Sequence, residues 1–206
     1  KCFSNVCTHR GFILYHHPGQ ERNLTCAYHG RRFDLDGKMV HMPEFSKTEN
    51  FPRQCDHLAS LKLENWNGFM FTSINPSFDF EIISKRLDER LYFLDFSKLR
   101  HNDQYDKIYN VNAHWALYCD NYLEGFHIPF VHNKLGSMID YGQYTTEIYE
   151  YVNLQIGYTK GDIPYFDLPR DHVDFGKKVT AYYYWIFPNF MLNVYPWGIQ
   201  VNVVAP

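Results

Sequence analysis

The chain has 206 residues, 45% of them hydrophobic, and carries 20 Lys and Arg against 23 Asp and Glu, for a formal net charge of −3. This length suffices for one or two domains of ordinary size, and the lack of a basic excess argues against nucleic acid as a partner. No apolar run approaches the ~18 residues of a membrane-spanning helix, and five cysteines without a paired framework favour a reducing, cytoplasmic location.

Residues 1–76 predict a small all-β domain. Short runs of strand type at 11–16, 57–65 and 68–74 alternate with Gly, Pro and Asp-Gly turns. The first residues already have a strand pattern with no start signal before them. We therefore expect further strands of this domain ahead of Lys1.

Residues 77–206 predict a second domain, of α+β class. Helix-like spacing over 78–96 is followed by a strand pattern at 106–112 and a helix over about 113–126. Strand patterns then return at 145–159, 177–187, 190–195 and 199–205. We expect the helix to lie against an antiparallel sheet. Since the last pattern is still that of a strand, we expect the domain to continue past Pro206.

Two short motifs, "CTHRG" and "CAYHG", each offer one thiol and one imidazole, from Cys7 and His9 and from Cys26 and His29. Zinc sites usually pair cysteine with cysteine and histidine with histidine. A Rieske-type [2Fe–2S] cluster instead needs two thiolates on one iron and two imidazoles on the other, so each of two gripping loops offers one of each. The motifs therefore predict a Rieske cluster, with zinc or a chance coincidence as the alternatives.

Glycines follow the histidine in both motifs, at Gly11 and Gly30. Because glycine tolerates backbone conformations that other residues avoid, we expect both loops to fold tightly. We also expect their N–H groups to point toward the cluster sulfurs.

The stretches "CTHRG" and "CAYHGRRFDLDGK" resemble the Rieske domain of the Rieske non-haem iron oxygenases. Relatives in respiratory bc complexes carry a further cysteine in each loop, and these form a disulfide. Here Phe12 and the pair Ala27-Tyr28 hold those positions, so we expect no loop disulfide. Because Arg31 and Arg32, and no Ser or Thr, follow the second motif, we expect a potential toward the low end of the Rieske range of about −150 to +300 mV.

A second constellation lies in "HWALYCDNYLEGFHIPFVH", residues 114–132. Asp120, Glu124 and His127 stand at i, i+4 and i+7, which would place them on one helical face, and His132 follows. Aromatic residues on the opposite face are expected to pack on the sheet: Trp115, Tyr118 and Tyr122. Two histidines and a carboxylate form the facial triad of oxygen-activating Fe(II). The run resembles the E-x-x-H-x4-H helix of the Rieske oxygenase catalytic domain, whose fold is a helix-grip α+β cavity.

The resemblance implies a role for each of these residues. His127 and His132 correspond to ligands of the mononuclear iron, and the third, a carboxylate, is expected beyond Pro206. Glu124 corresponds to the acidic residue that bridges, by hydrogen bonds, to a cluster ligand, here His29, of a neighbouring subunit. This relay implies a homo-oligomer, typically a trimer. A further candidate, Asp120, is expected to hydrogen-bond iron-bound water or a ligand histidine.

The implied function is that of an enzyme, a Rieske mono- or dioxygenase. Electrons from NAD(P)H would arrive through a flavin-containing reductase or a ferredoxin, and O2 would hydroxylate or demethylate a small organic substrate. Having Glu124 rather than Asp resembles the choline and carnitine branch, and 18% aromatic residues suit a quaternary amine, but an aromatic ring stays open as the substrate. The alternative is a Rieske ferredoxin-like electron carrier without oxygenase activity. Residues 1–206 alone are expected to be inactive, to hold the [2Fe–2S] cluster poorly and to bind mononuclear iron weakly or not at all.

Overall fold

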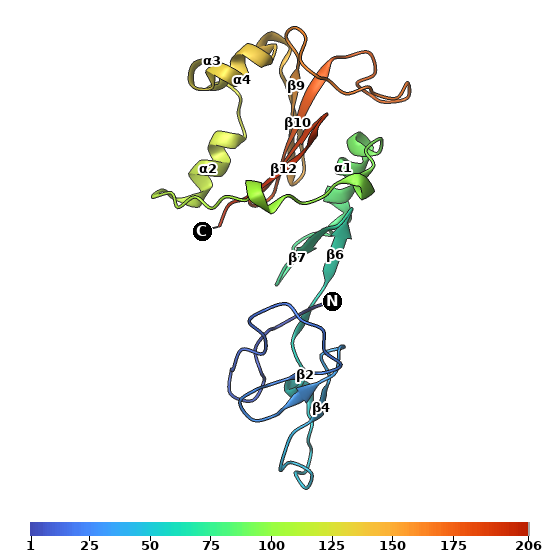
Figure 1. The fold of residues 1–206 in the computed structure, drawn as a ribbon, viewed down its shortest axis with the longest axis vertical. Helices are drawn as coiled ribbons and strands as arrows, with labels where there is room; N and C mark the ends of the chain where they lie inside the picture. Colours follow the sequence, from blue (N-terminus) through green and yellow to red (C-terminus); the bar gives the residue numbers. More distant parts are fainter. Residues whose placement is uncertain (206) are drawn as a thin grey trace. The chain divides into compact units, whose positions relative to one another are not determined.

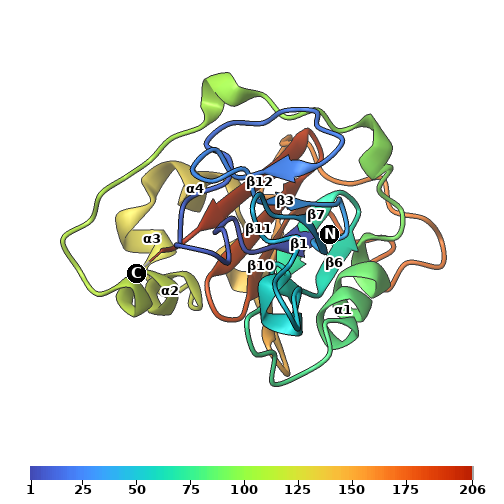
Figure 2. The same ribbon diagram turned by 90° about the horizontal axis from the view of Figure 1, so that it is seen from below.

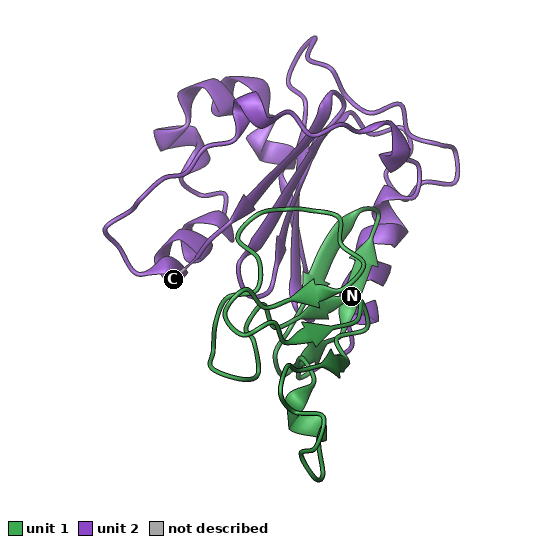
Figure 3. Ribbon diagram, turned by 60° about the horizontal axis from the view of Figure 1, so that its bottom comes forward, with its two compact units in different colours: residues 1–77 green, residues 78–206 purple. Residues whose placement is uncertain are grey.

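The computed structural model describes residues 1–205, which form two compact units. One unit spans Lys1–Ser77, and the other begins at Phe78 (Figure 3). The first unit contains short strands, and the second contains a larger sheet with helices. This confirms the predicted α+β class, with a β-rich part ahead of a mixed part.

The strands of the first unit are β1 (Cys2–Phe3), β2 (Leu24–Thr25), β3 (Arg32–Phe33), β4 (Met39–His41), β5 (Ser60–Leu61), β6 (Leu63–Trp66) and β7 (Phe69–Thr72), with a 3-10 turn, η1, at Gln54–Asp56. β1 pairs with β5, β2, β3 and β4 form one sheet, and β6 pairs with β7, all antiparallel. Asn67 and Gly68 turn the β6–β7 hairpin with φ of 50° and 92°. An Asn-Gly turn of this kind matches the twist of the strands that it joins.

The hydrophobic core of the first unit is built around the cysteines of the two motifs. Cys7 and Cys26 are only 2% and 1% exposed. They belong to one buried cluster with Leu14, Phe33, Met39, Met42 and Leu58. The predicted cluster ligands are therefore part of what holds this unit together.

The second unit contains α1 (Glu81–Leu91), α2 (Trp115–Tyr122), α3 (Ile128–Val131), α4 (Asn133–Met138), β8 (Thr145–Tyr149), β9 (Val152–Tyr158), β10 (Val179–Ile186), β11 (Phe190–Tyr195) and β12 (Gly198–Val203), and 3-10 turns at Phe96–Lys98, Asp103–Tyr105 and Tyr141–Gln143. Helix α1 forms because Ile83, Leu87 and Leu91 lie four residues apart, so that they share one face and are buried together. This confirms the helix predicted within 78–96.

Strands β8 to β12 form an antiparallel sheet in the order β12-β11-β10-β9-β8. Each strand pairs with the strand before or after it in the chain, so the sheet is a meander. Helix α1 lies on one side of the sheet, and α2, α3 and α4 lie on the other (Figures 1 and 2). The strands predicted from residue 145 onward are therefore confirmed as one sheet with helices laid against it.

The two faces of this sheet differ in chemistry, because alternate residues of a strand point to opposite sides. Tyr182 of β10 lies on the α1 side, where the guanidinium of Arg90 is 6.0 Å from its ring. Tyr183 lies on the other side, packed with residues of the α2–α4 region. Tyr183 pairs across the strands with two buried amides, Gln155 of β9 and Asn193 of β11. A third buried amide, Asn153, lies on the same face two residues before Gln155.

Two segments differ from the sequence-based expectation. Residues 106–112 contain no strand, and the side chains of Ile108 and Tyr109 are 93% and 75% exposed. Residues 11–16 contribute an isolated bridge between Ile13 and Val6 instead of a strand. Both segments contain residues with a preference for strands, but no neighbouring segment pairs with either of them over several residues.

Within residues 1–205, every helix is too short or too polar to cross a membrane.

A buried ion-pair network joins α1 to the sheet. The Arg90 guanidinium pairs with Asp174 and, at 2.5 Å, with Glu147. The Asp174 carboxylate also accepts hydrogen bonds from Lys177 Nζ at 2.9 Å and from the Tyr182 hydroxyl at 3.0 Å. Burial pushes the pKa of Asp174 upward, but the hydrogen bonds and positive charges of Lys177 and Arg90 more than offset this and hold the pKa below its usual value.

We expect Asp174→Asn to lower the free energy of unfolding by about 3–5 kcal/mol, because it removes one partner of a buried charge pair. The pKa of Asp174 is lower in the folded state, so its stabilisation is fully present above the unfolded pKa of about 3.9 and is lost as the pH falls through the folded value. Urea unfolding near neutral pH and in acid measures both effects.

Asp167→Asn is the matched control, because this carboxylate lies exposed in the same loop. It should change the free energy of unfolding by less than about 0.5 kcal/mol. Equal losses in the two variants would contradict the role given to the buried network.

Candidate metal centres

The two cysteine–histidine motifs fold into the same backbone turn. In each, the glycine four residues after the cysteine donates its N–H to the cysteine carbonyl at 3.0 Å, as Gly11 does to Cys7 and Gly30 to Cys26. Each cysteine N–H donates at 2.8 Å to the carbonyl of the residue after the glycine. Both glycines have a φ of 70°, which confirms the predicted tight loops. The histidine is the third residue of one turn and the fourth of the other.

The side chains of the two turns converge. The Cys7 and Cys26 thiols are hydrogen-bonding neighbours, and the His9 and His29 ring centroids are 4.7 Å apart. Nδ1 of His9 is buried without a hydrogen-bond partner. Two thiols, two imidazoles and an unpartnered ring nitrogen fit the donor set of a Rieske cluster.

Burial also sets the protonation of these groups. It raises the pKa of the Cys7 thiol, and Cys26 raises it further, although a hydrogen bond to the backbone of His9 and the charge of Arg31 oppose the rise. Burial lowers the pKa of His9, as do the positive charges of His29 and Arg31. A neutral imidazole is the form that binds metal, and a bound metal ion deprotonates a coordinating thiol.

Other expectations for the loops have mixed outcomes. The Gly11 and Gly30 N–H groups are bonded to cysteine carbonyls. Of the other loop residues, His9 hydrogen-bonds the Cys7 thiol through its backbone, as expected of a loop N–H group. The described cysteines are free thiols. Where related proteins have that disulfide, the Phe12 and Tyr28 rings lie 5.6 Å apart and join the two loops by an apolar contact.

The second constellation occupies a break between helices instead of one helical face. Helix α2 ends at Tyr122, so Asp120 is helical, whereas Glu124 lies in the following turn and His127 immediately precedes α3. The prediction that Asp120, Glu124 and His127 share one helical face is therefore wrong, because only Asp120 lies in a helix. The missed signal is Gly125, a residue that commonly follows a helix end.

His127 and His132 flank the short helix α3 and come together, with ring centroids 4.9 Å apart. One oxygen of the Glu124 carboxylate accepts a hydrogen bond from the Phe126 N–H, and the other contacts Nδ1 of His127. This leaves Nε2 as the His127 nitrogen available to a metal. A carboxylate on the second ring nitrogen is a common support of metal-binding histidines.

Burial pushes the pKa of Glu124 upward, but the hydrogen bonds from the His127 ring and the Phe126 N–H more than offset it. The pKa of Glu124 is therefore below its usual value. Its carboxylate is held as an anion beside the His127 ring.

Partly buried hydrogen bonds tie the turn between α2 and α3 to the sheet. The Tyr144 hydroxyl donates to Gln155 Oε1 at 2.9 Å, and Gln155 Nε2 donates to the Tyr122 carbonyl at 2.6 Å. The Tyr122 hydroxyl donates to Asn193 Oδ1. A Cβ added at Gly125 would lie 2.8 Å from a Tyr144 ring carbon, so the turn packs closely on that ring.

Sequence reasoning missed these anchoring residues, although a signal exists. Asn153, Gln155 and Asn193 interrupt strands that are otherwise apolar, and they recur at the alternate positions that face the helices. Burying an amide is costly unless it is hydrogen-bonded. A row of such amides therefore indicates a face built for something other than apolar packing.

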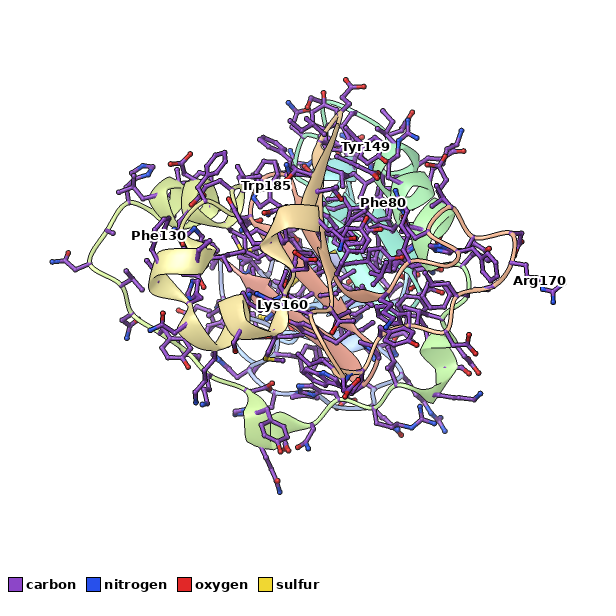
Figure 4. The ribbon with its side chains drawn as sticks, turned by 90° about the horizontal axis from the view of Figure 1, so that it is seen from above. Phe80, Phe130, Tyr149, Lys160, Arg170 and Trp185 are labelled. Atoms are coloured by element: carbon purple, nitrogen blue, oxygen red, sulfur yellow. The ribbon has the colours of Figure 1, made fainter. Side chains whose placement is uncertain are left out.

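Asp120 is exposed and lines an open pocket of about 540 Å³ beside α2. Aromatic side chains form much of its wall, including Trp115, Trp185 and Phe187. Trp185 lies on the sheet, whereas Phe130 projects from α3 and is 82% exposed (Figure 4). The hydrogen-bonding role expected of Asp120 stays a prediction.

Within residues 1–205, no three His, Cys, Asp or Glu side chains are grouped so as to hold a single metal ion. A Rieske cluster takes only two protein ligands at each iron. For the mononuclear iron, the third ligand remains the predicted carboxylate beyond Pro206.

Comparison with known families gives two matches. Residues 1–52 match the Rieske [2Fe-2S] domain, and residues 97–206 match the catalytic domain of the ring hydroxylating alpha subunit. The second match alone extends over more than half of the chain.

Among curated proteins, the chain is similar to the chloroplastic choline monooxygenase of Beta vulgaris, with 30% identity over 98% of this chain and 45% of the relative. It is 27% identical to the carnitine monooxygenase oxygenase subunit of Escherichia coli K12, over 99% of this chain and 54% of that subunit. A crystal structure of a quaternary ammonium Rieske monooxygenase has the same fold, with a TM-score of 0.75 at 23% identity over 98% of this chain and 54% of that one. The chain spans about half the length of the curated relatives it matches.

We expect Gly125→Ala to destabilise the second unit by about 1–3 kcal/mol, since the added methyl group overlaps the Tyr144 ring. Thermal unfolding measures the loss. Gly198→Ala is the control, because a Cβ at that position meets no atom within 4 Å. Adding Tyr144→Leu to Gly125→Ala should recover part of the loss, and no recovery would show that the ring is not its cause.

Proposed function

The chain belongs to the family of ring hydroxylating alpha subunits, and from this membership we propose that it is part of a Rieske oxygenase that oxidises a small organic molecule with O2. The observation that carries the proposal is the Glu124–His127 contact beside His132. A Rieske electron carrier needs the two cysteine–histidine turns, but it has no use for a second pair of histidines supported by a carboxylate.

In this proposal Cys7 and Cys26 hold one iron of the [2Fe–2S] cluster, and His9 and His29 hold the other. The matching turns and the unpartnered Nδ1 of His9 support the assignment. His29 is the exposed member of the two histidines, so we assign it as the side from which electrons leave.

His127 and His132 hold the mononuclear Fe(II), together with the carboxylate expected beyond Pro206. When bound, the cluster supplies electrons and the Fe(II) activates O2. Glu124 fixes the orientation of the His127 ring through Nδ1, keeps the proton on that nitrogen and makes Nε2 a better donor.

Glu124 also provides the link between subunits. Its side chain is 32% exposed, so a further hydrogen-bond partner can reach it. We assign that role to His29 of a neighbouring subunit, in a homo-oligomer that the family resemblance suggests is a trimer. A flavin-containing reductase or a ferredoxin supplies the electrons from NAD(P)H.

For the substrate, we favour a quaternary amine over an aromatic ring. Near the turn that carries Glu124, the Tyr183 and Tyr195 rings are 5.8 Å apart, and Tyr195 stacks on Trp197 at 4.7 Å. Aromatic faces attract organic cations. Choline and carnitine, which give two of the relatives their names, are such cations. Hydroxylation and demethylation are both open to this substrate class.

We expect His127→Ala in the full-length protein to abolish substrate oxidation while leaving the absorbance of the cluster unchanged. The reason is that the change removes one ligand of the mononuclear iron and touches no ligand of the cluster. Product formation, total iron per chain and the visible spectrum measure the effect.

His101→Ala is the control, because this histidine is exposed and pairs with Asp106. It should retain both iron and activity. Unchanged turnover in His127→Ala would favour the electron carrier instead.

A further inference from the structure

Arg31 joins the two cluster turns. Its carbonyl accepts the Cys26 N–H at 2.8 Å, which closes the second turn. Its guanidinium donates from Nη1 to Thr8 Oγ1, also at 2.8 Å, and Thr8 lies between Cys7 and His9 in the first turn. One residue therefore contacts both halves of the cluster site.

The charge of Arg31 is buried and only partly compensated. Its side chain is 3% exposed, and Asp56 Oδ1, on a side chain 9% exposed, lies 3.3 Å from Nη1. Nε of Arg31 has no partner, and the Phe51 ring lies 5.5 Å from the guanidinium carbon. The Asp56 carboxylate is shared with the Arg53 N–H, which donates to its second oxygen at 2.8 Å.

We propose that the buried Arg31–Asp56 pair sets the reduction potential of the Rieske cluster, with Arg31 raising it and Asp56 lowering it. The inference rests on the proposed ligands Cys7, His9, Cys26 and His29. These residues would hold a cluster that supplies one-electron transfer between the reductase or ferredoxin and the iron site, and no bond at Arg31 or Asp56 would form or break.

The physical reason is the energy of that added electron. A positive charge stabilises the reduced, more negative cluster, and a negative charge destabilises it. These interactions are strong where water is excluded and weak where it is not. Arg32 is adjacent in the chain but exposed, so its charge is screened.

The test is a redox titration of the full-length holoprotein and four variants, followed by visible absorbance. Arg31→Gln should lower the midpoint potential and Asp56→Asn should raise it. Arg31→Lys keeps the charge and should stay near the wild-type value, and Arg32→Gln should leave the potential unchanged. A purely structural role does not produce shifts of opposite sign from the two members of one ion pair.

Shifts of the same sign in Arg31→Gln and Asp56→Asn, or shifts no larger than that of Arg32→Gln, would overturn the proposal. Should Arg31→Gln fail to retain its cluster, Asp56→Asn and Arg31→Lys decide. A raised potential in Asp56→Asn with a wild-type value in Arg31→Lys supports the proposal, and any other result refutes it.

The ligand assignment is tested separately. Cys26→Ser should abolish the cluster spectrum, and a cluster that survives this change would refute the proposed ligands. A cluster lost in Cys26→Ser, but without opposed shifts in the charge variants, would refute only the role of Arg31 and Asp56.

Discussion

The first unit depends on the backbone hydrogen bonds of the two motif cysteines. At Cys7 and at Cys26, both the N–H and the carbonyl form hydrogen bonds that close a turn. With the backbone fixed, the thiol points into the core, where it packs with Phe33 and Met39, and the histidine lies nearer the surface. If these cysteines hold the cluster, as we propose, metal binding and folding are coupled, because the thiolate ligands are also core residues.

In the second unit, the two faces of the sheet differ in the side chains that they carry and in what those side chains hold in place. The face toward α1 is closed by apolar side chains and by the buried Arg90–Asp174 pair. The face toward α2, α3 and α4 carries amides whose hydrogen bonds hold the turn with Glu124 and His127. A polar network of this kind fixes geometry where its members are satisfied. Gln155 is satisfied by its bonds to both Tyr122 and Tyr144, whereas Oδ1 of Asn153 is buried without a partner.

Much of the fold and of the candidate sites could be predicted from the sequence, and each prediction that was wrong has a physical cause. Mixed thiol and imidazole motifs predicted the Rieske match, and the spacing of Ile83, Leu87 and Leu91 predicted α1. The strand expected at 106–112 failed because alternation shows only that a segment suits a sheet, whereas a strand also needs a partner. The helix expected over 113–126 was too long because the period of the polar residues was given more weight than Gly125. Arg31 was missed because burial of a charged side chain depends on Asp56, which is distant in the chain.

The alternation of β10 also bears on how this protein tolerates change. Tyr182, Tyr183 and Tyr184 are chemically identical, yet the middle one faces α2, α3 and α4 and its neighbours face the α1 side. Exchanging one ring for another of similar size leaves each face with its own chemistry. Inserting or deleting a single residue shifts the strand by one position and exchanges the two faces. The length of this strand is therefore under stricter constraint than the identity of any one tyrosine in it.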